Sequence, residues 1–174
     1  MPNRWCNSAE IRRKQIESGL DITFNEVFVP IFVKRISSLK PKRVLEVGAG
    51  TGHLSKVLSQ LNYEITAIEP SKGMYSVATE VLSNSSVELI NCSSFDLVQK
   101  SKFDVVFSHL VAHVVDDLEL FFNSIIPHLD FCSHFIFSIP HPCFYNSYKK
   151  LFGLEYNYMK PILKNISFTP LSLQ

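Results

Sequence analysis

Val44-Leu45-Glu46-Val47-Gly48-Ala49-Gly50-Thr51-Gly52 holds three of the six glycines of the chain within five residues. It begins as a short apolar run that is typical of a buried strand. Directly after it, Leu54, Val57, Leu58 and Leu61 repeat at the spacing of one helix face. Glycine permits a positive φ and lets backbone N–H groups approach a ligand that a Cβ atom would keep away. The segment therefore predicts a strand, a ligand-binding turn and a helix.

From Arg43 onward, apolar runs alternate with amphipathic segments. This alternation predicts an α/β fold of the Rossmann-like, doubly wound type, with a mostly parallel sheet and helices on both faces. The predicted strands are Val44–Val47, Ile65–Ile68, Val87–Ile90, Val105–Phe107 and Phe135–Ile139. The predicted helices are His53–Leu61, Met74–Leu82 and one that Asp116 or Asp117 caps and that carries Leu118, Phe122, Ile125, Ile126 and Leu129.

Two further helices are predicted before the first strand, one from Ser8 to about Gly19 and one from about Phe24 to Leu39. Asp21 or Thr23 can cap the second helix. Pro30 lies within it and removes one backbone donor, so we expect a kink or a break there. The predicted organisation is an N-terminal helical lid over 1–41, a cofactor-binding core over 42–144 and a C-terminal tail over 145–174.

The composition describes an ordinary globular chain of 174 residues, 46% of them hydrophobic and 19% charged. A net charge of +1 gives no strong attraction to nucleic acid or to an anionic membrane, so neither is predicted as a partner. The N-terminus shows no signal peptide, and the longest apolar tract, Val27–Val33, is too short to span a bilayer. The four cysteines form no C-x-x-C pair. We therefore expect a cytoplasmic protein with reduced thiols and no metal site.

The spacing of the glycines separates two classes of nucleotide-like ligand. A dinucleotide-binding turn would need its third glycine at position 53, which is His53. Glu46, at the entrance to the turn, would repel a pyrophosphate but suits a ligand that carries an ammonium and a sulfonium. Glu69 ends the next predicted strand, where a carboxylate can accept hydrogen bonds from both hydroxyls of a ribose. A surface carboxylate for Glu69 and a loop-bracing role for Glu46 are the alternatives.

These residues resemble the class I S-adenosylmethionine-dependent methyltransferases, in particular small-molecule enzymes related to quinone-biosynthesis methyltransferases. The resemblance covers roughly Lys42 to Phe144. It rests on the glycine stretch, on Ala67-Ile68-Glu69-Pro70-Ser71, on Phe103-Asp104-Val105-Val106-Phe107, and on Leu110-Val111-Ala112-His113-Val114-Val115-Asp116. It implies methyl transfer from S-adenosylmethionine to a small organic acceptor.

The resemblance also implies a set of cofactor-binding residues. The glycine turn would hold the methionine end of S-adenosylmethionine with Glu46 near its amino group, and Glu69 would hold the ribose. The family commonly has an acidic residue after its third strand for the adenine, where this chain has serines. The implied cofactor-binding residues are therefore Glu46, Gly48, Ala49, Gly50, Gly52, Glu69, Pro70, Ser93, Ser94, Phe95 and His109.

Three histidines are predicted near the carboxyl ends of the fourth and fifth strands, where the acceptor would bind: His109, His113 and His141. A histidine there can accept a proton near neutral pH, and these three are the candidate catalytic residues. The alternative for each is a hydrogen-bonded pocket wall without proton transfer. They lack a fourth ligand for a metal. His53 is assigned no role, and His128 and His134 are expected on the surface.

The resemblance implies a further helix and two strands after the fifth strand, but the thirty residues that follow Phe144 show no clear pattern of this kind, so we expect these strands to be missing. The fifth strand would then expose an apolar edge. Three explanations stay open: a truncated product, a tail that folds back (with Ile162–Phe168 as a strand), or a homodimer in which a second copy covers the edge.

Three alternative functions remain beside the leading hypothesis. The first is a module that binds the cofactor but is catalytically silent, either truncated or regulatory. A nicotinamide-dependent oxidoreductase is disfavoured by His53 and Glu46. A nucleic-acid methyltransferase is weaker still, because Ser108-His109-Leu110-Val111 stands where many amino-group methyltransferases have an Asn/Asp-Pro-Pro-aromatic loop.

Overall fold

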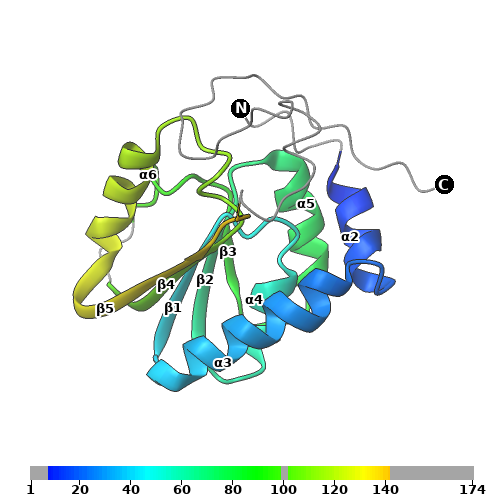
Figure 1. Ribbon diagram of the computed structural model, residues 1–174, viewed down its shortest axis with the longest axis horizontal. Coiled ribbons are helices and arrows are strands. Elements are labelled where there is room, and N and C mark those ends of the chain that lie inside the picture. Colours follow the sequence, from blue (N-terminus) through cyan, green and yellow to red (C-terminus); the bar gives the residue numbers. More distant parts are fainter. Residues whose placement is uncertain (1–7, 99–101, 142–174) are drawn as a thin grey trace. The chain divides into compact units, whose positions relative to one another are not determined.

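The computed structural model of the chain describes residues 8–98 and 102–141. The chain divides after Ser138 into two compact units. The first contains a five-stranded, all-parallel sheet (Figure 1). Its strands are β1 (Arg43–Val47), β2 (Glu64–Ile68), β3 (Glu88–Ile90), β4 (Phe103–His109) and β5 (Leu129–Ser138), in the order β3-β2-β1-β4-β5. The chain therefore reverses direction across the sheet between β1 and β4, where ligands of such folds bind.

Helices cover both faces of the sheet, as predicted. They are α2 (Ala9–Glu17), η1 (Thr23–Phe28), α3 (Val29–Leu39), α4 (His53–Ser59), α5 (Lys72–Val81), α6 (Leu118–Ile125) and the short η2 (Ile126–His128).

Successive strand residues point to opposite faces. Val44 and Phe107 pack in one core cluster with Phe32 and Leu58 from the helices, whereas Leu45 packs in the other with Phe121 of α6. The N-terminal helices thus share a core with the sheet.

The N-terminal helices follow the predicted pattern, with one local change. The Asp21 carboxylate accepts a hydrogen bond from the Phe24 amide at 2.8 Å and so caps the second helix. This helix starts as a π-helix, in which the Val29 amide donates to the Phe24 carbonyl, and changes to α-helix next to Pro30. The predicted break is therefore a change of winding, since proline has no N–H to continue the hydrogen-bond ladder.

The last helix and the fifth strand differ from the prediction. Asp117, and not Asp116, caps α6 by accepting from the Leu120 amide at 2.9 Å. The prediction carried this helix to Leu129, but α6 ends at Ile125 and η2 at His128, so that Leu129 begins β5. The first half of β5 carries polar residues, so a search for apolar runs does not detect it. The prediction that His128 lies on the surface was wrong, because it is 4% exposed.

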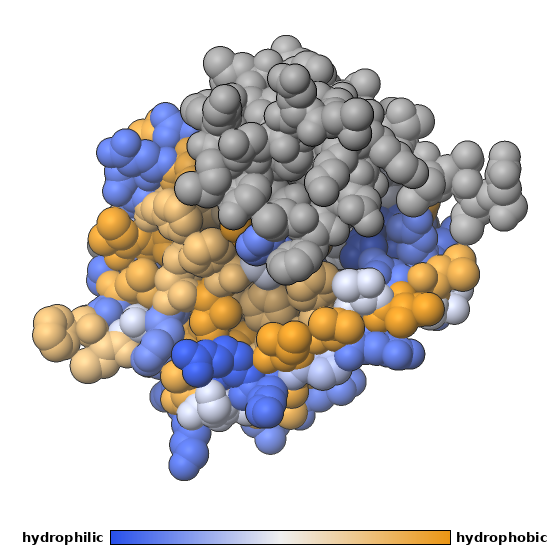
Figure 2. Space-filling model, viewed as in Figure 1, coloured by the Kyte–Doolittle hydropathy of each residue, from blue (hydrophilic) through white to orange (hydrophobic). Residues whose placement is uncertain are grey.

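Strand β5 is the edge of the sheet in the described part of the chain, where its one partner is β4. Apolar side chains are exposed on it, with Phe131 100% and Phe137 44% accessible. A second set of exposed apolar side chains lies along the N-terminal helical segment. Figure 2 shows orange surface where α3 lies in Figure 1. The side chains of this set are Leu20, Ile22, Val27 and Ile31. The tail, including the predicted strand Ile162–Phe168, lies outside the described residues.

Candidate active site

The glycine turn joins β1 to α4 at the carboxyl edge of the sheet. Gly48, Gly50 and Gly52 have φ of 76°, 57° and 79°, in the left-handed region that favours glycine. A Cβ atom at Gly48 would lie 2.4 Å from Val111 Cγ2, whereas one at Gly50 would meet nothing within 4 Å. Gly48 is therefore needed for packing against the loop after β4. Gly50 faces open space, where a ligand can approach the backbone.

Glu69 holds this turn against the end of β2. Its side-chain oxygens accept hydrogen bonds from the Gly50 amide and the Ser71 amide, both at 2.8 Å. The residue is 6% exposed, and burial raises the pKa of its carboxyl group against the two backbone hydrogen bonds. A carboxylate has about four acceptor positions. Each Glu69 oxygen thus retains acceptor capacity beside the open side of the turn.

Glu46 lies beneath the turn and braces the first turn of α4. Its carboxylate accepts a hydrogen bond from the Ser55 hydroxyl, and the residue is 2% exposed. Burial, together with a smaller effect of the nearby Glu69, raises the pKa of Glu46 to about 8 against the lowering effect of the hydrogen bonds from Ser55. The bracing role considered for Glu46 is therefore present in the structure. At neutral pH the side chain is mostly protonated, which weakens its attraction for a cation.

This raised pKa predicts a pH dependence of stability. The pKa of the Glu46 carboxyl is higher in the folded chain than in the unfolded chain, so folding takes up a proton between about pH 4.5 and 8. Stability therefore falls as the pH rises through this window, by at most about 1.4 kcal/mol per pH unit from this group. In urea titrations from pH 5 to 8, the free energy of unfolding of Glu46→Gln should fall less steeply with rising pH than that of the unmodified chain. An unchanged slope in the variant would show that Glu46 is not its source.

His109 is the last residue of β4, and its ring is enclosed by aromatic side chains. The ring centroids of Phe24, Phe28 and Phe32 lie 5.7, 4.5 and 5.5 Å from it. Its Nδ1 lies 2.7 Å from the Ser138 hydroxyl, while Nε2 is buried without a hydrogen-bond partner. Burial lowers the pKa of His109 to about 4, with a smaller effect of Arg12 in the same direction. His109 is therefore neutral at physiological pH.

The other two candidate histidines differ in position. His113 is exposed, four residues beyond β4, and close enough to His109 to contribute slightly to the lowering of its pKa. Partial burial lowers the pKa of His113. His141 is exposed and belongs to the second unit, so it is described by itself. Within the first unit, the structure brings His109 and His113 to the same end of β4.

The loop after β3 holds the residues expected near adenine. The Ser93 hydroxyl donates to Asp96 Oδ2 at 2.5 Å, and Ser94 Oγ lies 2.6 Å from Ser124 Oγ on α6. Phe95 is 60% exposed. Asp96 is an acidic residue of this loop that the sequence analysis did not consider, because it lies three positions beyond Ser93. Its hydrogen bond with Ser93 places the Asp96 carboxylate next to the residues expected near adenine.

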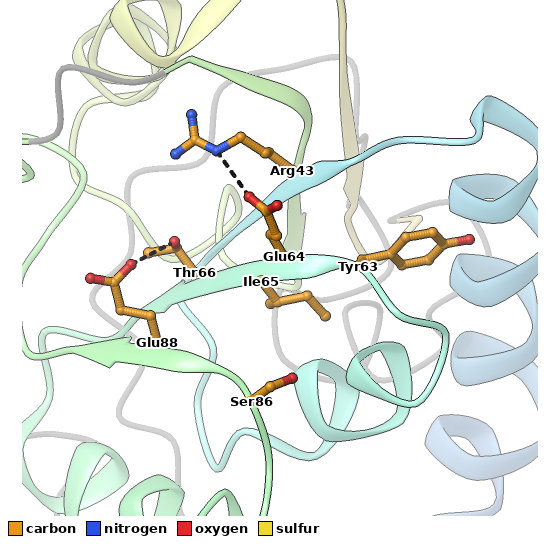
Figure 3. Close-up of a pocket in the computed structure, with 7 residues that line it drawn as sticks. All are labelled: Arg43, Tyr63, Glu64, Ile65, Thr66, Ser86 and Glu88. Carbon is orange, nitrogen blue, oxygen red and sulfur yellow. Dashed lines mark hydrogen bonds and ion pairs between the residues drawn. The ribbon is translucent and has the colours of Figure 1, made fainter.

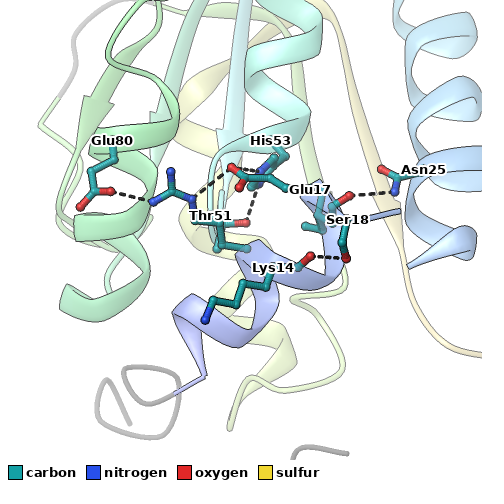
Figure 4. A network of polar contacts seen from close by, with 9 residues as sticks. Lys14, Glu17, Ser18, Asn25, Thr51, His53 and Glu80 are labelled. Atoms are coloured by element: carbon teal, nitrogen blue, oxygen red, sulfur yellow. Dashed lines mark hydrogen bonds and ion pairs between the residues drawn. The ribbon is translucent and has the colours of Figure 1, made fainter. Parts of the chain in front are cut away.

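His53, which the sequence analysis left without a role, belongs to a polar network between α2 and the glycine turn (Figure 4). Its Nδ1 lies 2.9 Å from Thr51 Oγ1, and its Nε2 lies 3.5 Å from Glu17 Oε1. Arg13 reaches Glu17 at 3.1 Å and Glu80 of α5 at 2.6 Å. Helix α2 is thus tied to both helices that flank the turn.

A cavity of about 260 Å³ lies at the opposite edge of the sheet (Figure 3). It is lined by the starts of β1, β2 and β3, including Arg43, Glu64 and Glu88. Thr66 donates to Glu88 at 3.0 Å, and Arg43 lies 3.8 Å from Glu64. Ligands of parallel α/β sheets bind beyond the carboxyl ends of the strands. This cavity is therefore separate from the candidate site at the glycine turn.

Comparison with known proteins agrees with the geometry of the turn. Residues 45–130, from β1 to the start of β5, match the family model described as "Methyltransferase domain". This chain carries a class I S-adenosylmethionine-dependent methyltransferase domain. Its cofactor is S-adenosylmethionine, which agrees with solved structures of similar fold that contain it.

Individual relatives match different shares of this chain. An uncharacterized methyltransferase of Staphylococcus carnosus is 35% identical over 65 residues, which are 36% of this chain and 31% of the relative. The DhpI–SAH complex is 25% identical with a TM-score of 0.58, over 79% of this chain and 68% of DhpI. A methyltransferase structure from Clostridium acetobutylicum has a TM-score of 0.61 at 22% identity, and the match covers 75% of this chain and 55% of that protein. The chain spans about a third of the length of the curated relatives it matches.

The residues of the methyltransferase domain fit S-adenosylmethionine at three places. Gly50 leaves open space at the turn, Glu69 retains acceptor capacity, and Asn91, which donates to the Glu69 carbonyl at 2.6 Å, holds the start of the next loop beside it. In residues 8–98 and 102–141, no three histidine, cysteine, aspartate or glutamate side chains gather where they could hold a metal ion. Over the same residues, no helix has the length and apolar character needed to cross a bilayer.

Gly50 provides a direct test of the turn. Gly50→Val should abolish binding of S-adenosylhomocysteine, because the side chain would occupy the open space in front of the turn. Some loss of stability is expected as well, since valine is strained at a φ of 57°. Calorimetric titration measures the binding, and circular dichroism checks the fold. A folded variant that still binds would show that the ligand does not approach the turn at Gly50.

Proposed function

We propose that the chain transfers a methyl group from S-adenosylmethionine to a small organic acceptor. The observation that carries this proposal is the pairing of Glu69 with the Gly50 amide beside open space at the turn. In this arrangement a carboxylate at the end of β2 and the backbone of the turn after β1 lie together, next to the switch point between β1 and β4, so that a ribose and a methionine chain can be held side by side.

Each candidate residue has a specific role in this proposal. Gly48, Ala49, Gly50 and Gly52 shape the turn around the methionine end, Glu69 and Pro70 lie at the ribose, and Ser93, Ser94 and Phe95 lie on the adenine side. Ser93 acts there together with Asp96, its hydrogen-bond partner. Glu46 supports the turn from below and, when ionised, attracts the cationic cofactor. The bound cofactor supplies a methyl group on a positively charged sulfur.

The acceptor side lies at the end of β4. Phe24, Phe28 and Phe32 make an apolar wall around His109, which favours a small acceptor with an apolar body and excludes water from the reaction. With a pKa of about 4, His109 is a weak base. It therefore orients the acceptor through a hydrogen bond at its unpartnered Nε2, and the proton of the acceptor passes to solvent or to His113.

Two measurements test the proposal. Calorimetric titration with S-adenosylhomocysteine should show micromolar binding, and release of S-adenosylhomocysteine should report turnover over a panel of small phenols, amines and carboxylic acids. His109→Ala should leave cofactor affinity within twofold and lower turnover at least tenfold, whereas the control His134→Ala, on exposed β5, should change neither. Loss of cofactor affinity in His109→Ala would instead place this residue on the cofactor side.

The second candidate function is a cofactor-binding module without turnover. It is favoured by one observation, that burial lowers the pKa of His109 to about 4 and leaves only a weak base at the end of β4. Cofactor binding without turnover on the whole acceptor panel would support this function over the first.

A further inference from the structure

Besides Glu69, a second side chain attaches the glycine turn to its surroundings. Thr51 lies between Gly50 and Gly52, and it is only 4% exposed. Its hydroxyl oxygen lies 2.9 Å from Nδ1 of His53, the first residue of α4. The Thr51 side chain is therefore turned away from solvent and bonded to the His53 ring. None of the roles proposed above for methyl transfer involves either of these two residues.

The direction of this hydrogen bond follows from the other nitrogen of the ring. His53 Nε2 lies 3.5 Å from Glu17 Oε1, at the outer limit of a hydrogen bond (Figure 4). Burial lowers the pKa of His53 more than Glu17 raises it, so the ring is neutral at pH 7. An ionised carboxylate only accepts, so Nε2 carries the ring hydrogen and Nδ1 accepts from the Thr51 hydroxyl. The contact with Glu17 thus sets the ring to receive Thr51.

Glu17 is held in place by α5 and not by the turn. Arg13 donates to Glu17 at 3.1 Å and to Glu80 of α5 at 2.6 Å. The hydrogen bond from Arg13 also lowers the pKa of Glu17, which keeps this carboxyl ionised. Ala9 of α2, 2% exposed, forms a core cluster with three residues of α5, which are Met74, Val77 and Val81. Arg13, Glu17, His53 and Thr51 therefore form a relay that runs from α5 through α2 to the glycine turn.

The shielded end of this relay lies at the turn. The ion pairs of Arg13 and Glu17 are partly exposed, and such pairs contribute little to stability. The contact between Thr51 and His53 is shielded, since only 12% of the His53 side chain is accessible. It lies next to Gly50, where open space admits a ligand. A misplacement of about 1 Å in a binding site can lower function strongly, so a relay at this place can matter more for binding than for stability.

We propose that His53 is a positioning residue of the cofactor site. Held by Glu17 of α2, its ring fixes the Thr51 hydroxyl and so sets the conformation in which the turn presents the Gly50 backbone to S-adenosylmethionine. Helix α2 then takes part in binding the cofactor, in addition to the lid that the sequence predicts. The proposal rests on the cofactor half of the proposed function and is independent of the acceptor.

Two single variants and their combination test the relay. His53→Ala removes the acceptor of the Thr51 hydroxyl, and Thr51→Val removes the hydroxyl while keeping the shape of the side chain. Each should weaken S-adenosylhomocysteine binding about three- to tenfold in calorimetric titration, the effect of one hydrogen bond. Because both variants break the same bond, the double variant should bind within twofold of the weaker single variant. Losses that multiply, or unchanged affinity in folded His53→Ala, would overturn the proposal.

A conservative variant separates positioning from a purely structural role. His53→Asn can place its side-chain oxygen near the former position of Nδ1, where it accepts from Thr51. It should therefore restore cofactor affinity to within twofold of the unmodified chain, even where urea denaturation shows a loss of stability. Affinity as weak as that of His53→Ala would contradict the proposal, because the bulk of the ring and not its hydrogen bond would then be what matters.

The part assigned to α2 is tested at Glu17. Glu17→Ala should weaken S-adenosylhomocysteine binding about two- to fourfold, less than His53→Ala, because the Glu17 side chain is 49% accessible. The matched control is Glu10→Ala, which removes an exposed carboxylate from the same helix and should leave the affinity unchanged. Equal affinities in the two variants would overturn the role of α2.

Amide exchange followed by NMR without ligand gives a result that does not depend on binding. The Gly50 amide donates to Glu69 at 2.8 Å, and the Gly52 amide is hydrogen-bonded within the turn at 2.9 Å. Both should exchange about threefold faster in His53→Ala than in Lys56→Ala, an exposed position of α4, because a loosened turn opens more often. Equal rates would overturn the proposal. If the unmodified chain bound no S-adenosylhomocysteine, the proposed function would fail, whereas these rates would still decide the role of His53.

Discussion

Glu69→Ala is expected to weaken binding of S-adenosylhomocysteine by roughly 10- to 100-fold. Hydrogen bonds to a charged group contribute about 1.5–3 kcal/mol, and each 1.4 kcal/mol is a factor of ten in affinity. The variant also leaves the Gly50 and Ser71 amides without their side-chain acceptor, so the turn itself loses its attachment to the end of β2. Calorimetric titration of the folded variant measures the effect.

The matched control is Glu64→Ala, which removes a carboxylate from the first residue of the same strand, at the edge of the sheet away from the turn. The Glu64 side chain is 60% exposed, and its ion pairs at 3.8 Å are of the weak surface kind. Its cofactor affinity should match that of the unmodified chain. Glu69→Gln keeps the shape of the side chain and one acceptor oxygen, so it should bind with intermediate affinity. Unchanged affinity in a folded Glu69→Ala would remove Glu69 from the cofactor site.

Phe32→Ala should lower the free energy of unfolding by about 3–5 kcal/mol, the usual cost of truncating a buried phenylalanine. Phe32 is 3% exposed, and its ring packs 5.5 Å from Phe107 of β4 and 5.5 Å from His109. Since small domains are stable by about 5–15 kcal/mol, this is a large fraction of the total. Urea denaturation at a fixed pH measures it.

A comparison of Phe32→Ala with Phe28→Ala distinguishes the contribution of the core from that of the candidate acceptor wall. Phe28 is only half-buried, although its ring is the one closest to His109, at 4.5 Å. Phe28→Ala should therefore lose less stability than Phe32→Ala while opening the same wall around His109. Both variants should retain cofactor affinity, because neither residue touches the glycine turn. A loss in Phe32→Ala no greater than that in Phe28→Ala would contradict the assignment of Phe32 to the core.

The strands and the glycine turn could be predicted because their signals are local. The apolar run Val44–Val47 is buried on both faces of the sheet, and the glycines that follow adopt positive φ, so neighbours in sequence specify both features. Strand β5 was predicted too short for the converse reason. Its first half carries Asp130, Ser133 and His134 and lies at the sheet edge, where burial does not require an apolar run.

The environment of the candidate site depends on residues that are distant in sequence. His109 was recognised at the end of the fourth strand, but its low pKa results from enclosure by Phe24, Phe28 and Phe32, which lie about eighty residues earlier. His53 belongs to a polar network because its Nε2 lies near the Glu17 carboxylate on α2. His128 was expected on the surface and is buried against the segment after β3. No periodicity within a single segment reports such contacts.

The sequence alone determined the α/β class, the strand–turn–helix at residues 44–61 and the choice of S-adenosylmethionine over a dinucleotide. These depend on the period of apolar residues and on the spacing of three glycines, which are properties of neighbouring positions. Only the tertiary structure decided that Glu69 holds the glycine turn, that His109 is neutral, and that His128 is buried. Each of these depends on desolvation or on a hydrogen bond between segments that meet only when the sheet and its helices pack together.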